Sequence, residues 1–156
     1  MLGNETVIQQ LNEALKGELT AIVQYIVHAE MCQNWGYGRL GGYMKKQAID
    51  EMKHAEGLIE RILFLDGTPK VDVMPTPRIG ASVKAQLEND LAAELSAVSE
   101  YNSAVAICTQ AQDNTSRALF EAMVTDEEKH TDFLESQLFI IGEIGVDNYL
   151  AQQIHG

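Results

Sequence analysis

Apolar residues recur along most of this chain at steps of three and four positions, which is the pattern of helices that bury one face. Residues of high helix propensity, chiefly Ala, Leu, Glu and Gln, fill many of the positions between them. Glycines interrupt the pattern between the helical stretches, and Ser82 is a suitable N-cap. The pattern predicts four long helices and a short fifth one, over about 4–35, 39–66, 82–111, 115–143 and 147–154.

All three prolines, Pro69, Pro75 and Pro77, lie between the second and third predicted helices. Proline is excluded from helix interiors because it lacks the amide donor and clashes with the preceding turn. The second helix is about 42 Å long at ~1.5 Å per residue, and the segment 67–82 can extend over about 53 Å at ~3.3 Å per residue. This segment can therefore return along the whole bundle. The fold class we expect is all-α: one domain over 1–156, a four-helix bundle with one long crossover, as found in ferritin-like folds.

The chain is strongly acidic, since 11 Lys and Arg residues against 23 Asp and Glu residues leave a net charge of −12. Nucleic-acid binding needs a basic surface, so we expect no nucleic-acid partner, whereas an acidic surface concentrates cations. No apolar run is long enough to span a bilayer, and the N-terminus lacks a signal-peptide pattern. The two cysteines, Cys32 and Cys108, form no Cys-x-x-Cys motif. We therefore expect a reduced, cytoplasmic protein with no membrane partner.

The two halves of the chain share a pattern of residues when the first half is shifted by 76 positions. The repeated positions share one face of each helix and are mostly apolar. In the first and third helices they are Leu11, Leu15, Glu18, Ile22, Tyr25, Ala29 and Cys32, matched by Leu87, Leu91, Glu94, Val98, Tyr101, Val105 and Cys108. In the second and fourth they are Met44, Glu51, His54, Leu58, Ile62 and Leu65, matched by Phe120, Glu127, His130, Leu134, Leu138 and Ile141. Each apolar stripe is thus interrupted near its middle by Glu or by Glu-x-x-His.

Carboxylates within apolar stripes need a compensating charge, because burying an ionised carboxylate costs on the order of several kcal/mol unless it is paired or binds a metal. No Arg or Lys shares these stripes. Two divalent cations would neutralise the four glutamates, and two neutral imidazoles would complete the ligand set. The alternative interpretation is that Glu18 and Glu94 are solvated and the histidines only fill core positions.

We expect the interrupted stripes to bind two metal ions. The expected ligand set is Glu18, Glu51, His54, Glu94, Glu127 and His130. Carboxylate oxygens with one imidazole per ion suit iron or manganese, and four Glu with two His is a known ligand pattern of di-iron and di-manganese bundles. Glu51 and Glu127 are expected to bridge the ions, with Glu18 and Glu94 as terminal ligands.

Two further pairs of polar residues follow the same repeat. Asp50 and Asp126 each precede a glutamate of the ligand set. Either Asp could accept the free N–H of a ligand histidine and fix its tautomer, on its own helix or on the opposite one, although a solvated Asp is the alternative. Tyr25 and Tyr101 lie two turns beyond the stripe glutamates, where core packing, hydrogen bonding or electron supply would each be consistent with the pattern.

Met52 breaks the repeat, since its counterpart is the charged Glu128. We therefore expect Met52 to point away from the apolar stripe. A subunit interface is the ordinary explanation for an exposed methionine, and a thioether in such an interface can also ligate haem iron.

Several motifs resemble those of bacterioferritins, over essentially the whole chain. They are Asp50-Glu51-Met52-Lys53-His54, Arg61-Ile62-Leu63-Phe64-Leu65, Asp126-Glu127 followed by His130, and Asn148-Tyr149-Leu150. The resemblance implies a homo-oligomeric hollow shell of 24 subunits, built from two-fold dimers, that stores ferric mineral. It also implies a di-iron ferroxidase centre at the ligand set above and a b-type haem between paired subunits with Met52 as axial ligand. A small iron–sulfur ferredoxin would supply the electrons for iron release.

Four residues depart from those common in that family. Lys46 stands where an inner-surface His is frequent, and Lys45, Ile26 and Phe133 stand where Tyr, Phe and Trp are frequent. The departures concern the inner iron site, the haem surroundings and the route of electrons, and they leave the expected di-iron ligands untouched.

The function we expect is oxidation of Fe(II) by O2 or peroxide at the di-iron centre, followed by storage of the product. A rubrerythrin-like peroxidase would share the bundle site but normally adds a Cys-x-x-Cys iron centre, which this chain lacks. A ferritin-like oxidase acting on an organic substrate would differ from a storage protein only in its iron-loading capacity. A purely structural bundle is the third alternative, which the carboxylates in the stripes disfavour.

Overall fold

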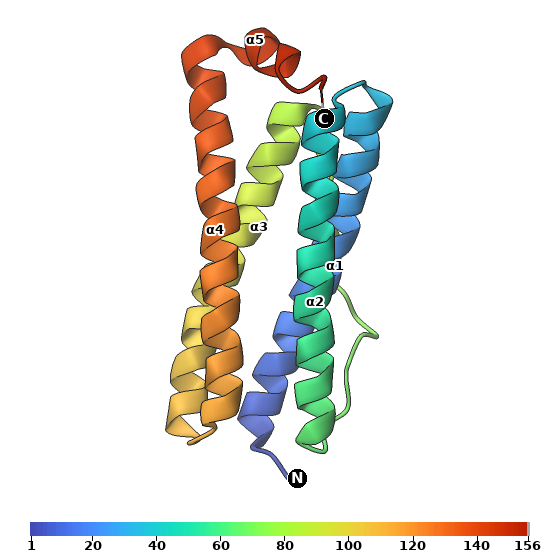
Figure 1. Cartoon of the computed structure of the whole chain (residues 1–156). Helices are drawn as coiled ribbons and strands as arrows, with labels where there is room; N and C mark the ends of the chain where they lie inside the picture. The colour runs from blue at the N-terminus through green and yellow to red at the C-terminus, as the bar shows by residue number, and fades with distance from the viewer. Residues whose placement is uncertain (156) are drawn as a thin grey trace.

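The computed structural model of the protein describes residues 1–155, which form a bundle of four long helices with a short helix across one end (Figure 1). The helices are α1 (Glu5–Asn34), α2 (Gly38–Phe64), α3 (Val83–Gln110), α4 (Asn114–Ile144) and α5 (Val146–Ala151). Short turns join α1 to α2 and α3 to α4, so each pair is an antiparallel hairpin. Helices α2 and α3 run in the same direction, as the colour order in Figure 1 shows. The predicted bundle with one long crossover is therefore confirmed.

Three of the long helices begin at a side chain that caps them. Asn4, Ser82 and Asp113 each accept a hydrogen bond from a backbone amide in the first turn of α1, α3 and α4, respectively. Such a bond satisfies a donor that would have no partner at the helix start. The predicted N-cap at Ser82 is confirmed, and the bounds of the long helices differ from the predicted ones by one or two residues, as helix ends usually do.

The fifth helix is shorter than predicted, and the expectation that it reaches residue 154 is wrong. Beyond Ala151 the amides of Gln152 and Gln153 bond to carbonyls three residues earlier, in tighter turns than those of an α-helix. The carbonyl of Gln153 then accepts a hydrogen bond from the amide of Arg39 at the start of α2. This contact ties the C-terminal residues to the α1–α2 hairpin instead of extending α5.

The buried apolar residues form two clusters, one toward each end of the bundle. One cluster includes Leu11, Leu58 and Phe120, and the other includes Met44 and Leu87. The middle of the bundle, between the clusters, is where the repeat places its glutamates and histidines. Among the described residues, no helix combines the length and the hydropathy of a membrane span.

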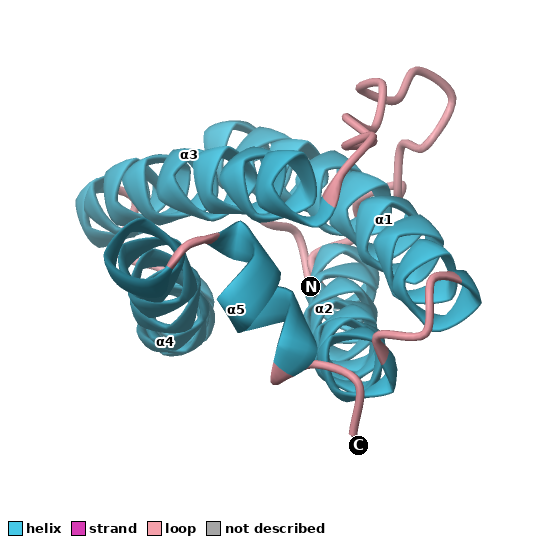
Figure 2. Ribbon diagram, turned by 90° about the horizontal axis from the view of Figure 1, so that it is seen from above, coloured by secondary structure: helices cyan, strands magenta, loops and turns pink. Residues whose placement is uncertain are grey.

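The crossover between α2 and α3 lies on the outside of the bundle beside α1 (Figure 2). Side chains of α1 bind its backbone at several places along the segment. The Asn12 side chain donates to the carbonyl of Thr68 and accepts from the amide of Lys70, and Gln24 accepts from the amide of Arg78. A segment without regular structure is thereby held along the surface of α1.

Candidate metal centre

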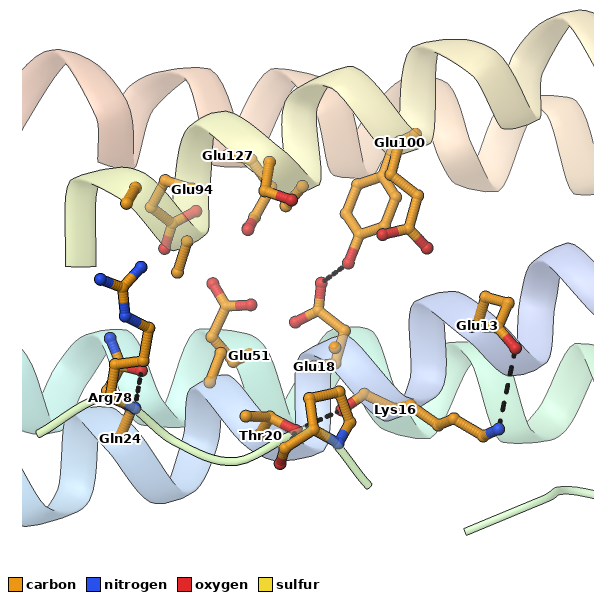
Figure 3. Close-up of a pocket in the computed structure, with 18 of the residues that line it drawn as sticks. Glu13, Lys16, Glu18, Thr20, Gln24, Glu51, Arg78, Glu94, Glu100 and Glu127 are labelled. Atoms are coloured by element: carbon orange, nitrogen blue, oxygen red, sulfur yellow. Dashed lines mark hydrogen bonds and ion pairs between the residues drawn. The ribbon is translucent and has the colours of Figure 1, made fainter. Parts of the chain in front are cut away.

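The six residues of the expected ligand set lie together in the middle of the bundle. Helices α1 and α3 each contribute one glutamate, and α2 and α4 each contribute one Glu-x-x-His pair. The four glutamates, which point toward one another in Figure 3, are at most 2% exposed. The side chains of His54 and His130 are 10% and 7% exposed. The alternative of solvated glutamates is therefore excluded.

The ligand atoms form two overlapping groups. One is Glu18, Glu51, His54 and Glu127, and the other is Glu51, Glu94, Glu127 and His130. Within each group, one oxygen or nitrogen per residue lies within 4.8 Å of all the others. Glu51 and Glu127 belong to both groups, whereas each of the other four residues belongs to one. The arrangement has room for two ions that share two carboxylates.

Buried atoms without hydrogen-bond partners are concentrated at this place. Of eleven such side-chain oxygens and nitrogens in the described part of the chain, seven belong to the six residues, and every one of the six contributes at least one. Glu51 contributes both of its carboxylate oxygens. Burying polar atoms without partners is costly, and a cation would satisfy carboxylate oxygens and imidazole nitrogens at once. The residues present therefore fit a pair of bound metal ions.

The two histidines turn the same ring atom toward the centre. Nδ1 of His54 lies 3.4–3.8 Å from oxygens of Glu18, Glu51 and Glu127, and Nδ1 of His130 lies 3.1 Å from Glu51 Oε1. In both residues the opposite nitrogen, Nε2, points out of the ligand cluster. The Nδ1 atoms are therefore the ones available to a metal.

Each Nε2 faces an aspartate on the opposite helix. His54 Nε2 on α2 is 2.8 Å from Asp126 Oδ2 on α4, and His130 Nε2 on α4 is 3.5 Å from Asp50 Oδ2 on α2. Only the first distance makes a hydrogen bond. The sequence leaves the choice of helix open, and the structure resolves it: each aspartate faces the histidine across the bundle.

Without a cation, the carboxylates of the centre differ in their affinity for protons. Burial, together with the charge of Glu51, raises the pKa of Glu18 well above its ordinary value. Burial and the proximity of Glu94 likewise raise the pKa of Glu127. Burial also opposes ionisation of Glu51, but close polar contacts with Glu18 and with the imidazoles outweigh it and lower the pKa of Glu51. Metal binding at this centre must therefore displace protons.

The histidines also hold protons, because the carboxylates around them favour the charged imidazolium form. Burial alone would lower the pKa of both imidazoles. Glu18 and Glu51 outweigh burial at His54 and raise its pKa to about 11, and Glu51 and Glu94 raise the pKa of His130 to about 10. At neutral pH the metal-free protein thus carries two imidazolium charges beside its carboxylates. These positive charges stand where bound cations would otherwise neutralise the carboxylates.

Two tyrosine hydroxyls reach the centre from opposite helices. Tyr25 on α1 donates a hydrogen bond of 2.7 Å to Oε1 of Glu94 on α3, and Tyr101 on α3 donates one to Oε1 of Glu18 on α1. Both tyrosines are 2% exposed. Of the roles that the sequence leaves open for these residues, packing and hydrogen bonding are both realised.

A cavity of about 570 Å³ lies between α1, α3 and the crossover and reaches the carboxylates of the centre (Figure 3). Glu18, Glu51, Glu94 and Glu127 line its inner end. Toward the surface it is lined by charged side chains, among them Glu13, Lys16, Arg78 and Glu100. This cavity connects the buried carboxylates with the outside of the α1–α3 face.

A second cavity, of about 500 Å³, lies on the α2–α4 side of the two histidines. Lys46, Lys53 and Lys129 line it, together with the aspartates that face the histidines. Tyr43 and Phe133 stack at its edge with ring centroids 3.6 Å apart. Lys46 and Phe133, two of the departures from common family residues, are therefore close neighbours of the centre on this side.

Met52 is 46% exposed on α2 and so points away from the core, as expected. Ile49, one turn earlier on α2, is 43% exposed, and Ile26 on α1 is 47% exposed. Ile49 and Met52 are three positions apart and therefore lie on the same face of α2.

A buried polar cluster next to the centre was not predicted. His28 Nδ1 lies 3.0 Å from Asp90 Oδ1, the Gln24 side chain donates to the same oxygen at 2.8 Å, and His28 Nε2 accepts the backbone N–H of Gly80 at 3.0 Å. His28 and Asp90 are both 0% exposed. A Cβ at Gly80 would lie 2.3 Å from the backbone nitrogen of Gln86, so the close approach of the crossover requires glycine.

The repeat contains the signal that would have identified this cluster. The positions that correspond to His28 and Asp90 in the other half of the chain are occupied by Ala104 and Ala14. A histidine and an aspartate on the repeated helices whose counterparts are both alanine indicate a contact that the other half lacks. Here that contact is with the crossover, which is not duplicated.

Comparisons with known proteins agree with this architecture. The family model "Ferritin: Ferritin-like domain" matches residues 8–141. The bacterioferritin of Mycolicibacterium paratuberculosis is 43% identical over 152 residues, which cover 97% of this chain and 96% of that protein. The bacterioferritins of Brucella melitensis and Rhodobacter capsulatus are 42% and 40% identical over 149 residues, which cover 96% of this chain and 92% of each relative. The chain belongs to the bacterioferritins, the ferritin-like proteins that oxidise and store iron.

Proposed function

We propose that each subunit oxidises two Fe(II) ions at the buried centre and passes the Fe(III) product to storage as a mineral. The observation that carries this proposal is the convergence of seven buried, unpartnered ligand atoms from six residues on one place. Iron is the substrate of this centre, and carboxylate oxygens with imidazole nitrogens suit both of its oxidation states.

The two ligand groups indicate the role of each residue. Glu51 and Glu127, present in both groups, bridge the two ions, while Glu18 with His54 and Glu94 with His130 each complete one ion. Asp126 and Asp50 orient the two imidazoles through Nε2. Tyr25 orients Glu94 through its hydrogen bond to Oε1.

Two adjacent ions suit the electron balance of the reaction. Oxidation of two Fe(II) releases two electrons, which with two protons convert O2 to H2O2, or H2O2 to two water molecules. The protons that the carboxylates and imidazoles hold in the metal-free protein leave when iron binds, because the ligands must be deprotonated. The ions are held inside the bundle, since the glutamates are buried.

The cavity on the α1–α3 face is the route that we propose for Fe(II). It extends from Glu13 and Glu100 near the surface to Glu18 and Glu51 at the centre. The net charge of −12 adds a long-range attraction for cations, which salt screens over about 8–10 Å at physiological ionic strength. Uptake of Fe(II) should accordingly slow as the salt concentration rises.

We further propose that the protein is a cytoplasmic, homo-oligomeric store, with 24 subunits built from two-fold dimers, and that b-type haem binds between paired subunits. The exposed Met52 thioether, with Ile49 one turn away, is a donor that suits haem iron in an apolar interface. A bound haem would supply a one-electron carrier. A small iron–sulfur ferredoxin is the reductant that we propose for iron release through it.

The test of the centre is stopped-flow oxidation of Fe(II) under air. Glu94→Ala and His130→Ala should each abolish the rapid phase while far-UV circular dichroism still shows the helical bundle. Glu128→Ala is the matched control, because Glu128 is an exposed carboxylate next to Glu127 on the same helix. Rapid oxidation at the wild-type rate in both centre variants would refute the proposal. Rapid oxidation without retention of iron would favour an oxidase that does not store it.

A further inference from the structure

We infer that Tyr101 is a positioning residue of the centre: its hydroxyl engages one oxygen of Glu18 and thereby directs the other oxygen to a metal ion. This inference rests on the proposed function of the centre. Tyr101, in the second half of the repeat, acts on Glu18 as Tyr25 acts on Glu94. The metal position concerned is the one formed by Glu18 and His54.

The two oxygens of Glu18 have different surroundings. Oε1 accepts the hydrogen bond of the Tyr101 hydroxyl, which is the dashed line that ends on Glu18 in Figure 3. Oε2 has no hydrogen-bond partner, is buried, and lies 3.6 Å from Nδ1 of His54. The carboxylate therefore presents one free oxygen to the cluster, in a fixed direction.

The same division occurs at the other terminal glutamate and is absent from Glu51. Oε1 of Glu94 accepts from Tyr25, and Oε2 of Glu94 is buried without a partner. Both oxygens of Glu51 are buried without a partner. A glutamate that serves one ion thus has one oxygen engaged by a tyrosine, whereas no tyrosine engages either oxygen of Glu51, which belongs to both ligand groups.

The ring of Tyr101 is itself held in place. It is 2% exposed and packs against Phe120, with ring centroids 5.9 Å apart. Packing alone would be served equally well by phenylalanine, and a buried hydroxyl is tolerated only with a hydrogen-bond partner. The partner here is a ligand carboxylate that projects from a different helix, α1, so the bond also fixes Glu18 against rotation away from the cluster.

Loss of the hydroxyl should therefore change metal affinity more than fold. Residues that orient metal ligands in this way typically contribute about 10- to 100-fold in affinity. In Tyr101→Phe, Glu18 would lose its donor, so either oxygen could turn toward the cluster and its orientation would vary. One of the two binding steps should weaken by that factor, and the step at Glu94 and His130 should stay unchanged.

The experiment is a titration of the full-length, metal-free protein with Co(II), followed by visible absorption under anaerobic conditions. Co(II) is a probe that binds carboxylate–imidazole sites without being oxidised by them. We expect two ions per subunit in the wild type, one step weakened about 10- to 100-fold in Tyr101→Phe, and a changed absorption spectrum for that step. Tyr25→Phe should weaken the other step.

Tyr149→Phe is the matched control. Tyr149 is also 2% exposed and donates its hydroxyl to Gln137 Oε1 at 2.7 Å, but it belongs to the apolar cluster at one end of the bundle. Its variant should lose stability as Tyr101→Phe does and bind both Co(II) ions as the wild type does. Tyr101→Leu, which also lacks the hydroxyl, should reproduce the binding change and replaces Tyr101→Phe if that variant does not fold.

Two results would overturn the inference while the proposed function stands. One is unchanged binding of both Co(II) ions in the Tyr101 variants, and the other is the same loss in Tyr149→Phe. A further test combines Tyr101→Phe with Glu18→Ala. The double variant should bind Co(II) as the Glu18→Ala variant does, because Tyr101 acts through Glu18. If the wild type itself fails to bind two ions per subunit, or if Glu94→Ala binds them normally, the proposed function fails instead.

Discussion

His54 on α2 and Asp126 on α4 form a hydrogen bond of 2.8 Å across the bundle, from Nε2 to Oδ2. The related pair, His130 and Asp50, is separated by 3.5 Å. The repeat that relates the two halves of the chain is therefore imperfect just where the imidazoles are oriented. One histidine is held by a hydrogen bond and the other by a longer contact.

Replacing Asp126 should consequently weaken metal binding more than replacing Asp50. We expect Asp126→Ala to lower Co(II) affinity about 10- to 100-fold at one position, because Nε2 of His54 loses its acceptor and the ring is free to turn. Asp50→Ala should have a smaller effect, since it removes no hydrogen bond. Asp132→Ala, at an exposed aspartate of α4, is the control. Equal losses in the Asp126 and Asp50 variants would contradict the inequality of the two pairs.

The metal-free protein should become less stable as the pH rises above neutrality. An unfolded histidine loses its proton near pH 6.5, whereas His54 and His130 in the folded protein have pKa values of about 11 and about 10. Between these limits the folded state binds more protons than the unfolded state, so the free energy of unfolding falls with increasing pH. Glu18 and Glu127, whose pKa values are also raised, act with the same sign. Glu51, whose pKa is lowered, contributes a constant amount over this range.

Thermal unfolding followed by circular dichroism, from pH 6.5 to pH 9, measures this dependence. The melting temperature should fall with pH in the metal-free protein. It should fall less with saturating Co(II), because bound ions take over the neutralisation of the carboxylates. His155→Ala should keep the wild-type slope, since His155 is exposed at the end of the chain. A slope that is the same with and without Co(II) would show that the proton-binding groups are not the metal ligands.

Sequence periodicity was sufficient to predict the fold and the place of the centre. The spacing of Glu18 relative to Leu15 and Ile22 puts its side chain in an apolar stripe, and the structure buries it to 1% exposure. The long crossover followed equally from the three prolines in one segment. These features depend on local spacing along a helix, which a sequence displays directly. The role of Glu18 as a metal ligand stays a prediction that the geometry supports.

Contacts between helices could not be predicted in this way. The pairing of His54 with Asp126, and not with Asp50 of its own helix, depends on how α2 and α4 face each other. The bond of Tyr101 to Glu18 likewise depends on the register of α3 against α1. The cluster of His28 and Asp90 joins residues 62 positions apart with no motif in common.

The cluster of His28 and Asp90 should account for a measurable part of the stability. In Asp90→Ala, the imidazole N–H of His28 and the side-chain amide of Gln24 would both be buried without an acceptor. We expect the free energy of unfolding to fall by about 3 kcal/mol, measured by urea denaturation at fixed protein concentration. The crossover should also become more sensitive to proteases, because His28 binds the amide of Gly80. Asp72→Ala, at an exposed aspartate of the crossover, should change stability by less than about 0.5 kcal/mol; a comparable loss there would refute the role of the cluster.

Haem binding should depend on Met52 and be separable from the metal centre. Met52 is exposed, whereas its neighbour Glu51 is 1% exposed and lies on the buried side of α2, so a change at Met52 need not disturb the ligand cluster. In Met52→Leu, the side chain keeps its apolar volume and loses the sulfur, and we expect the low-spin spectrum of methionine-ligated haem to disappear after reconstitution. Co(II) should still bind at two ions per subunit. Met74→Leu, at a 37% exposed methionine of the crossover, should keep the haem spectrum. A low-spin spectrum that persists in Met52→Leu would identify a different ligand, and loss of the spectrum in both variants would exclude Met52 as the specific one.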